Sequence, residues 1–217
     1  TFYRHCQPIL EELNAAERVI TDLQAKPTGK LMMTAPVTYG ERIIAPVIND
    51  IAKAHPELEI HLHLTNQLVD LIHDGYDLAI RLGTLEDSSY IARRLSSRAW
   101  HMAASPDYLA KFGTPHSISE LAKHQCILGT SDSWKFSRQG KPELVRVKAR
   151  MRCNSGVAVI DAALKGLGIA QLPDYYVNPY LESGELVEVM PGYQIADEGI
   201  WAIYPSTRHL SPKVRLV

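Results

Sequence analysis

The sequence predicts an α/β protein of two units, with the chain returning to the first unit at its end. Strand-like and helix-like segments alternate from Lys30 onward, which is typical of parallel strands joined by helical crossovers. A second series of such segments follows, and an apolar strand over 199–204 ends it. Two small lobes with a cleft between them are suited to hold a small molecule.

Composition restricts the classes of function. The chain has 217 residues, of which 46% are hydrophobic, so it can bury a sizeable core. Its formal net charge of -1 provides no basic field of the kind that a self-sufficient nucleic-acid binder has. The cysteines, Cys6, Cys126 and Cys153, are odd in number and widely spaced, which indicates a reducing compartment. With no apolar run of roughly 18 residues and no signal segment, the sequence predicts a cytoplasmic protein with no membrane contact.

Residues 1–27 predict a long helix. Apolar residues recur at spacings of three and four, at Phe2, Cys6, Ile9, Leu13, Ala16, Ile20 and Leu23. Lys26-Pro27-Thr28-Gly29 ends the helix. This seam favours a linking or dimerising helix, and a helix packed on its own domain is the alternative.

The first unit reads as β-α-β-α-β. Its predicted elements are a strand over 31–35, a helix over 41–54, a strand over 58–64, a short helix over 68–72 and a strand over 76–82. Pro56 prevents the first helix from continuing, and Gly75 is suited to close the second one. Each crossover is expected to be right-handed.

The second unit begins with a strand over 91–104, in which Arg98 is expected to be exposed. Ser105 is a candidate N-cap, and Pro106 suits the first helical position. The remaining predicted elements are a short helix over 119–124, a strand over 126–129, antiparallel strands over 134–138 and 143–151, a helix over 157–165, a strand over 169–172, a helix over 175–182 and a strand over 186–190.

Several motifs in this order resemble one family. After the amphipathic helix come Leu31–Gly40, His55-Pro56, Asp77–Gly83, Ala104–Leu109 and Gly166–Pro173. Together they resemble the linker helix and effector-binding domain of a LysR-type transcriptional regulator, and the resemblance covers essentially the whole chain. The winged helix-turn-helix of that family has no counterpart in the sequence, so we expect the chain to begin within the linker helix.

The resemblance implies two Rossmann-like lobes of periplasmic-binding-protein type II architecture, joined by two crossing strands. It implies a linker or dimerisation helix over 1–27, lobe I over 28–98 and 198–217, and lobe II over 99–197. It also implies a bacterial, non-enzymatic regulator without cofactor or metal, which binds a small-molecule effector between its lobes. Homodimers or homotetramers, and DNA contacts through the missing N-terminal domain, are expected with it.

Ligands in open α/β folds gather at the carboxyl ends of strands, where helix N-termini point. Two loops offer backbone N–H groups and polar side chains there, Pro36-Val37-Thr38 and Asn154-Ser155-Gly156, which suits a carboxylate. Helix capping by Thr38 and Ser155 is the alternative. With the resemblance, the predicted effector-binding residues are Pro36, Val37, Thr38, Thr65, Asn66, Gly83, Gly129, Ser131, Asn154, Ser155 and Trp201.

Other candidate residues have competing interpretations. Arg81 suits a carboxylate partner, but its place in a strand motif favours a structural ion pair. Trp100 and Trp201 suit either a ligand platform or hinge packing. His61 and His63 lie on one face of a strand without a third ligand at useful spacing, so no metal site is predicted.

Two other functional classes compete with the regulator. A periplasmic-type solute-binding protein shares the two-lobed cleft, but it needs no amphipathic N-terminal helix. An enzyme on the same fold has only the fold behind it. The sequence contains no GxSxG motif, and no motif ties a Ser, a His and an Asp together.

Overall fold

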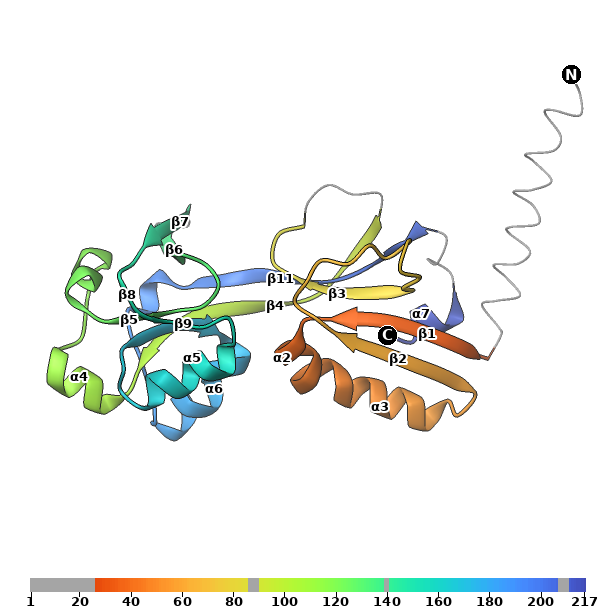
Figure 1. The fold of residues 1–217 in the computed structure, drawn as a ribbon, viewed down its shortest axis with the longest axis horizontal. Helices are drawn as coiled ribbons and strands as arrows, with labels where there is room; N and C mark the ends of the chain where they lie inside the picture. The colour runs from red at the N-terminus through yellow and green to blue at the C-terminus, as the bar shows by residue number, and fades with distance from the viewer. Residues whose placement is uncertain (1–25, 86–89, 139–140, 207–210) are drawn as a thin grey trace, which may run out of the picture. The chain divides into compact units, whose positions relative to one another are not determined.

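A computed structural model describes residues 26–85, 90–138, 141–206 and 211–217 (Figure 1). The chain forms two compact α/β units. Of the described residues, those up to Leu95 and those from Ile200 to Val217 form unit 1, and those from Ser96 to Gly199 form unit 2. Two long strands, β4 (Tyr90–Ala104) and β11 (Ile195–Pro205), contribute to both units. The predicted α/β class is confirmed, whereas the predicted N-terminal helix lies outside the described residues.

The sheet of unit 1 has the strand order β2-β1-β3-β11. Its first three strands are β1 (Gly29–Ala35), β2 (Leu58–Leu64) and β3 (Leu78–Leu82). Strand β1 runs parallel to both β2 and β3, and β11 is antiparallel to β3. The alternating sequence of β2 predicted both of its ends correctly, because polar and apolar side chains fall on opposite faces of a strand.

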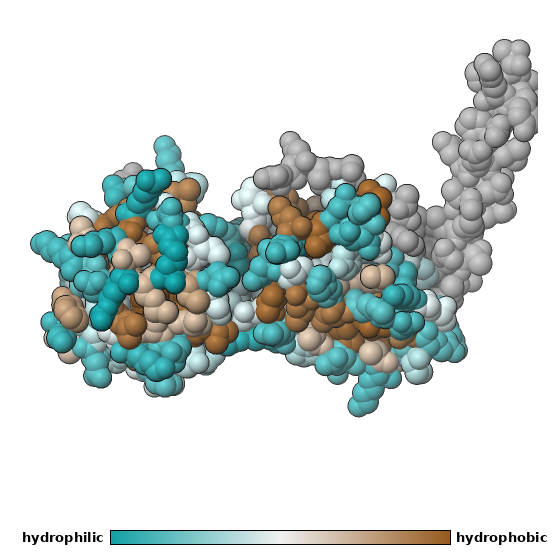
Figure 2. Space-filling model, viewed as in Figure 1, coloured by the Kyte–Doolittle hydropathy of each residue, from teal (hydrophilic) through white to brown (hydrophobic). Residues whose placement is uncertain are grey.

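The predicted helix over 41–54 begins earlier than expected. It consists of α2 (Val37–Tyr39), a π-helical turn, η1 (Gly40–Ile44), and α3 (Ala45–Ala54), which covers one face of the sheet (Figure 1). A Cβ on Gly40 would collide with the side chain of Leu64, so glycine permits this close approach to β2. Figure 2 shows apolar surface along this helix, where Ile43 and Val47 are 41% and 51% exposed.

The short helix predicted over 68–72 is wrong, since residues 68–70 are irregular and a turn spans 71–75. Asp70 Oδ1 accepts hydrogen bonds from the backbone N–H groups of Ile72 and His73, both at 3.0 Å. A side chain that satisfies nearby amides in this way competes with helix formation. Leu68 and Ile72, whose spacing predicted the helix, are 88% and 64% exposed.

The end of the chain is anchored to the start of the unit 1 sheet. Asp77 is 2% exposed and accepts hydrogen bonds from the backbone N–H of Met32 at 3.0 Å and from Lys213 Nζ at 2.7 Å. Lys213 belongs to the short helix α7 (Pro212–Arg215) and also donates to the carbonyl of Lys30. A buried carboxylate needs such partners, so α7 completes unit 1.

The sheet of unit 2 has the order β4-β9-β5-β8, and β10 pairs with β4. Its further strands are β5 (Cys126–Leu128), β8 (Ala149–Arg152), β9 (Ile169–Pro173) and β10 (Val187–Glu188). A separate hairpin consists of β6 (Ser133–Arg138) and β7 (Lys141–Arg146). The predicted strand over 143–151 is therefore wrong in its extent, because its second half leaves the hairpin and joins β5 in parallel.

Helices cover the unit 2 sheet. The elements are α4 (Pro106–Phe112), α5 (Gly156–Leu164), α6 (Asp174–Ser183) and the 3-10 turns η2 (Ile118–Lys123) and η3 (Pro191–Tyr193). Helices α5 and α6 pack on Ile127, Ala170 and Leu172, while Tyr108, Trp134 and Phe136 fill a second core cluster. The predicted N-cap is confirmed, since Ser105 Oγ accepts from the backbone N–H of Tyr108 at 3.3 Å. Within the described ranges, every helix is too short or too polar to cross a membrane.

Candidate functional site

Unit 2 contains a cavity of about 190 Å³ at the carboxyl ends of β5 and β9 and the start of α5. Trp100, Trp134, Tyr175 and Tyr176 supply its aromatic wall. Its polar lining includes Arg98, Thr130, Ser131, Lys135, Asn154 and Gln171. An apolar body with a few convergent polar groups is typical of small-molecule sites.

The charged side chains in the cavity lining are Arg98 and Lys135. The Arg98 guanidinium carbon lies 5.1 Å from the centre of the Trp100 ring, and Lys135 Nζ lies 5.0 Å from it. Cations at these distances are attracted by the ring. The prediction that Arg98 is exposed is wrong, because its side chain is only 10% exposed.

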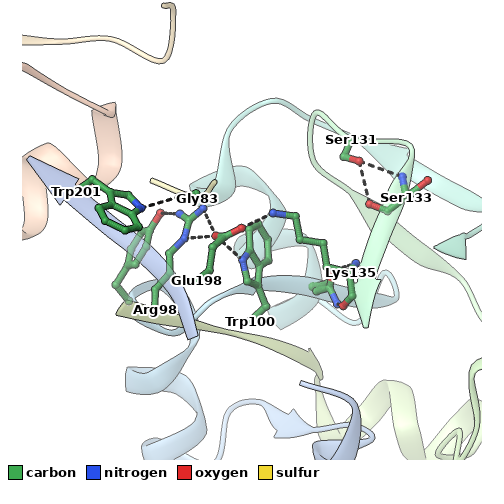
Figure 3. A network of polar contacts seen from close by, with 10 residues as sticks. Gly83, Arg98, Trp100, Ser131, Ser133, Lys135, Glu198 and Trp201 are labelled. Carbon is green, nitrogen blue, oxygen red and sulfur yellow. Dashed lines mark hydrogen bonds and ion pairs between the residues drawn. The ribbon is translucent and has the colours of Figure 1, made fainter. Parts of the chain in front are cut away.

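Glu198, from β11, joins these residues (Figure 3). Its Oε2 accepts from Arg98 Nε at 2.6 Å and from Trp100 Nε1 at 2.8 Å, and its Oε1 accepts from Lys135 Nζ. Burial raises the pKa of the Glu198 carboxyl, but Arg98, Lys135 and Trp100 outweigh burial and hold it below its ordinary value. Glu198 is therefore a carboxylate at neutral pH.

Gln171 fixes the backbone at Lys135. The backbone N–H of Lys135 donates to Gln171 Oε1 at 2.8 Å, and Gln171 Nε2 donates to the carbonyl of Lys135 at 2.6 Å. The side chain of Gln171, on β9, thus pairs with the backbone of β6 as a neighbouring strand would. Gln171 is 7% exposed, so these two hydrogen bonds give its buried side-chain oxygen and nitrogen a partner each.

Tyrosines close the side of the cavity next to α5 and α6. Arg98 Nη1 donates to the Tyr175 hydroxyl at 3.2 Å, and burial raises the pKa of Tyr175 to about 12. The Tyr176 ring lies over the first residue of α5, where a Cβ on Gly156 would lie 2.6 Å from its hydroxyl oxygen. Glycine at this position allows the ring to sit against the helix N-terminus.

Three of the predicted effector-binding residues of unit 2 line the cavity: Gly129, Ser131 and Asn154. The Ser131 hydroxyl is engaged in a turn, accepting from the backbone N–H of Ser133 at 3.1 Å and donating to its carbonyl at 2.9 Å. Ser155 is the N-cap residue of α5, but its side chain makes no cap hydrogen bond. The capping alternative for Ser155 is therefore wrong.

Apart from Trp201, the predicted residues of unit 1 follow the carboxyl ends of the neighbouring strands β1, β2 and β3. Val37 donates its backbone N–H to Asn66 Oδ1 at 3.1 Å, which brings the ends of β1 and β2 together. Pro36 is the N-cap of α2 and Thr38 lies within that helix, so Thr38 does not cap it. The Thr65 hydroxyl accepts from the backbone N–H of Gln67 at 3.1 Å.

Gly83 follows the end of β3, and Trp201 lies on the adjacent strand β11. Trp201 Nε1 donates to the Gly83 carbonyl at 2.8 Å, and the Arg94 guanidinium carbon lies 5.8 Å from the centre of the indole ring (Figure 3 shows the indole). Arg81 pairs with Trp201 across the two strands. Within the described part of the chain Arg81 has no ion pair, contrary to the structural pair that was expected. Burial lowers the pKa of its guanidinium.

The two histidines of β2 have protein partners. His61 Nε2 lies 2.6 Å from Glu59 Oε1, and His63 Nδ1 lies 2.5 Å from the Tyr76 hydroxyl. Across the described ranges, no three His, Cys, Asp or Glu side chains are grouped so that they could hold a metal ion.

Sequence reasoning missed the charged part of the cavity: Lys135 and Glu198 were not singled out, and Arg98 was placed in solvent. Lys135 and Glu198 are 63 residues apart, and Arg98 and Glu198 are 100 residues apart. No spacing rule connects residues at such separations. The available signal was the acidic pair Asp197-Glu198 directly before the apolar strand 199–204.

Comparisons with known proteins agree with this fold. The chain matches the LysR substrate binding domain over residues 24–217. It is 36% identical over 217 residues to an HTH-type transcriptional regulator of Haemophilus influenzae, covering 98% of this chain and 75% of that protein. It is 32% identical over 219 residues to the HTH-type transcriptional activator TtdR of Escherichia coli K12, covering 99% of this chain and 70% of that protein.

Solved structures give the same result. The full-length virulence activator AphB of Vibrio cholerae has a TM-score of 0.78 at 31% identity, with 99% of this chain and 75% of AphB covered. CrgA of Neisseria meningitidis has a TM-score of 0.78 at 28% identity, with 99% of this chain and 74% of CrgA covered. These relatives are transcriptional regulators, and none of them supports the solute-binding alternative. The chain therefore belongs to the LysR family of transcriptional regulators, and it carries their effector-binding domain.

Proposed function

We propose that this domain senses a small anionic metabolite, a carboxylate, in the cavity of unit 2. The observation that carries the proposal is the pair of cations, Arg98 and Lys135, in the lining of an otherwise aromatic and polar cavity. LysR regulators bind small-molecule effectors, form oligomers and bind DNA. An occupied cavity is thus the signal that the domain passes to the DNA-binding part of its regulator.

The chemistry of the lining favours a carboxylate. Lys135 has three N–H donors, of which Glu198 uses one, and its side chain remains 38% exposed. Helix α5 begins at the cavity, and the partial positive charge of a helix N-terminus favours an anion. A volume of about 190 Å³ lies below the roughly 300 to 1,000 Å³ that drug-sized ligands need, which favours a small metabolite.

The unit 1 residues Pro36, Val37, Thr38, Thr65, Asn66, Gly83 and Trp201 remain predicted effector-binding residues, together with Ser155 in unit 2. Three of the strand ends that carry them meet at one edge of a parallel sheet, where open α/β folds bind ligands. We also propose that the regulator acts in the cytoplasm, because its free cysteines Cys126 and Cys153 suit a reducing compartment. As a LysR regulator it is proposed to act as a homodimer or homotetramer.

The proposal is tested by thermal unfolding of the chain with a panel of small carboxylates and, for each, the neutral amide of the same shape. A ligand that binds only the folded state raises the melting temperature by mass action. We expect carboxylates to raise it and neutral amides to leave it unchanged. Lys135→Gln should weaken carboxylate binding by about tenfold, because it removes a charge-assisted hydrogen bond.

Lys165→Gln is the matched control, since Lys165 pairs with Asp161 on the exposed face of α5 and does not line the cavity. It should bind the same carboxylates as the unmodified chain. Equal shifts with carboxylates and amides, or equal binding by the two lysine variants, would contradict an anion site at Lys135.

A further inference from the structure

Glu198 places a negative charge directly beside the lining of the cavity. Its side chain is 9% exposed and contacts three lining residues, Arg98, Trp100 and Lys135 (Figure 3). A ligand in the cavity therefore meets cations whose charge is already partly neutralised by the protein.

The hydrogen bonds of Glu198 divide the two cations into unequal roles. Both Nε and Nη2 of Arg98 contact Oε2, at 2.6 and 2.5 Å, and Nη1 donates to Tyr175. Arg98 is thus engaged by protein groups on both sides and is 10% exposed. Lys135 contacts only Oε1 of Glu198 and is 38% exposed, so it is the cation with donors left for a ligand.

The charges around the cavity can therefore be counted. Arg98 and Lys135 contribute two positive charges, and Glu198 contributes one negative charge. Nearby Asp174 directs its carboxylate to the backbone N–H groups of Ala99 and Tyr175, and Asp132 pairs with Arg152 in an exposed contact. Glu198 contacts both cations of the lining, whereas the contacts of Asp174 and Asp132 are with other groups, so one positive charge of the lining stays uncompensated.

We propose that Glu198 determines the charge of the effector, so that the cavity takes a monoanionic carboxylate and rejects a dianion of the same shape. The inference rests on the proposed function, since it requires an anion in this cavity. A second carboxylate would be desolvated among aromatic walls with no free cation to pair with. Without the charge of Glu198, Arg98 would be the partner of that second carboxylate.

The test uses matched probes that differ in charge and not in shape. Malonate, succinate and glutarate are compared by calorimetry with malonamate, succinamate and glutaramate, in which an amide replaces one carboxylate. We expect the unmodified chain to bind the monoanion of at least one pair about tenfold more tightly than its dianion. Glu198→Gln should reverse this preference, because it leaves both cations available while it preserves the shape of the side chain.

Glu188→Gln is the control. Glu188 is 27% exposed and pairs with His101 away from the cavity lining, so its loss should leave the preference for the monoanion unchanged. A second pair of variants covers the case in which Glu198→Gln fails to fold. Lys135→Gln leaves Arg98 and Glu198 as a neutral pair and should weaken monoanion binding by about tenfold. Lys135→Gln combined with Glu198→Gln should restore that binding through Arg98.

The outcomes separate this inference from the proposed function. Anion binding with the same monoanion preference in the unmodified chain and in Glu198→Gln, or no restoration in the double variant, overturns the role of Glu198 alone. Failure of every probe to bind both the unmodified chain and Glu198→Gln overturns the anion site itself, and the inference with it.

Discussion

Two glycines of the cavity lining, Gly129 and Gly156, differ in the space around them. A Cβ on Gly129 would have no atom within 4 Å, whereas a Cβ on Gly156 would collide with the Tyr176 ring. Tyr176 is 8% exposed, and its ring centre lies 4.7 Å from that of Tyr175. The Tyr176 ring therefore has little room to move away, and the shape of the cavity depends on glycine at 156 and not at 129.

Gly156→Ala should lower the free energy of unfolding by about 1 to 3 kcal/mol, the usual cost of forcing an extra methyl group into a packed site. Gly129→Ala should change it by less than about 0.5 kcal/mol, as surface substitutions usually do. Urea denaturation followed by tryptophan fluorescence measures both values. Equal unfolding midpoints for the two variants would show that Tyr176 yields freely.

The sequence identifies residues with local roles better than residues whose roles depend on partners far away in the chain. Gly129, Ser131 and Asn154 were found because strand ends and helix starts can be predicted locally. Glu198 was not, since its three partners come from β4 and β6, far from it in sequence. Only the folded arrangement of those strands reveals that its carboxylate is shared.

At the scale of elements, two helices of unit 2 begin with a serine that behaves differently in each. Ser105 Oγ accepts a hydrogen bond from the backbone N–H of Tyr108, and Ser105 is 4% exposed. Ser155 is exposed and its hydroxyl makes no cap hydrogen bond at α5. The serine before α4 thus caps its helix, whereas the serine before α5 does not.

Ser105→Ala should destabilise the chain by about 1 kcal/mol through the loss of its cap. Ser155→Ala should leave the unfolding midpoint nearly unchanged and weaken binding of a carboxylate found in the panel above. Guanidinium denaturation and calorimetry on the same two proteins separate stability from binding. A stability loss of the same size in Ser155→Ala would restore helix capping as the role of Ser155.

The elements that the sequence predicted well are those with complete local signals. Strand β2 has strict alternation, and α4 has both a serine cap and a proline at its first position. The segment 68–72 failed because Asp70 bonds to the backbone N–H groups that a helix would use. The segment 143–151 failed because its second half pairs in parallel with β5, a tertiary choice that local propensity does not record.

At the scale of the whole molecule, the two units differ in how the chain builds them. Unit 2 is continuous in sequence, Ser96–Gly199, and contains every residue of the cavity lining as well as Glu198. Unit 1 needs a second segment, Ile200–Val217, which supplies residues of β11 beside β3 and the lysine that pairs with Asp77. The final residues are thus part of the first unit and not an appendage.

This construction predicts that the units differ when they are produced separately. Residues 96–199 alone should unfold cooperatively on heating, and their cavity should still bind monoanions more tightly than dianions of the same shape. Residues 26–95 alone should not fold, because β3 keeps β1 but loses its other neighbour, β11. Asp77 would also lose the ion pair with Lys213, and breaking a buried ion pair costs about 3 to 5 kcal/mol. Residues 26–95 joined to 200–217 through a glycine-serine linker should fold, and in that protein Lys213→Met should again prevent folding. Cooperative unfolding of 26–95 alone would show that the returning segment is dispensable, whereas failure of 96–199 to fold would make unit 2 dependent on unit 1.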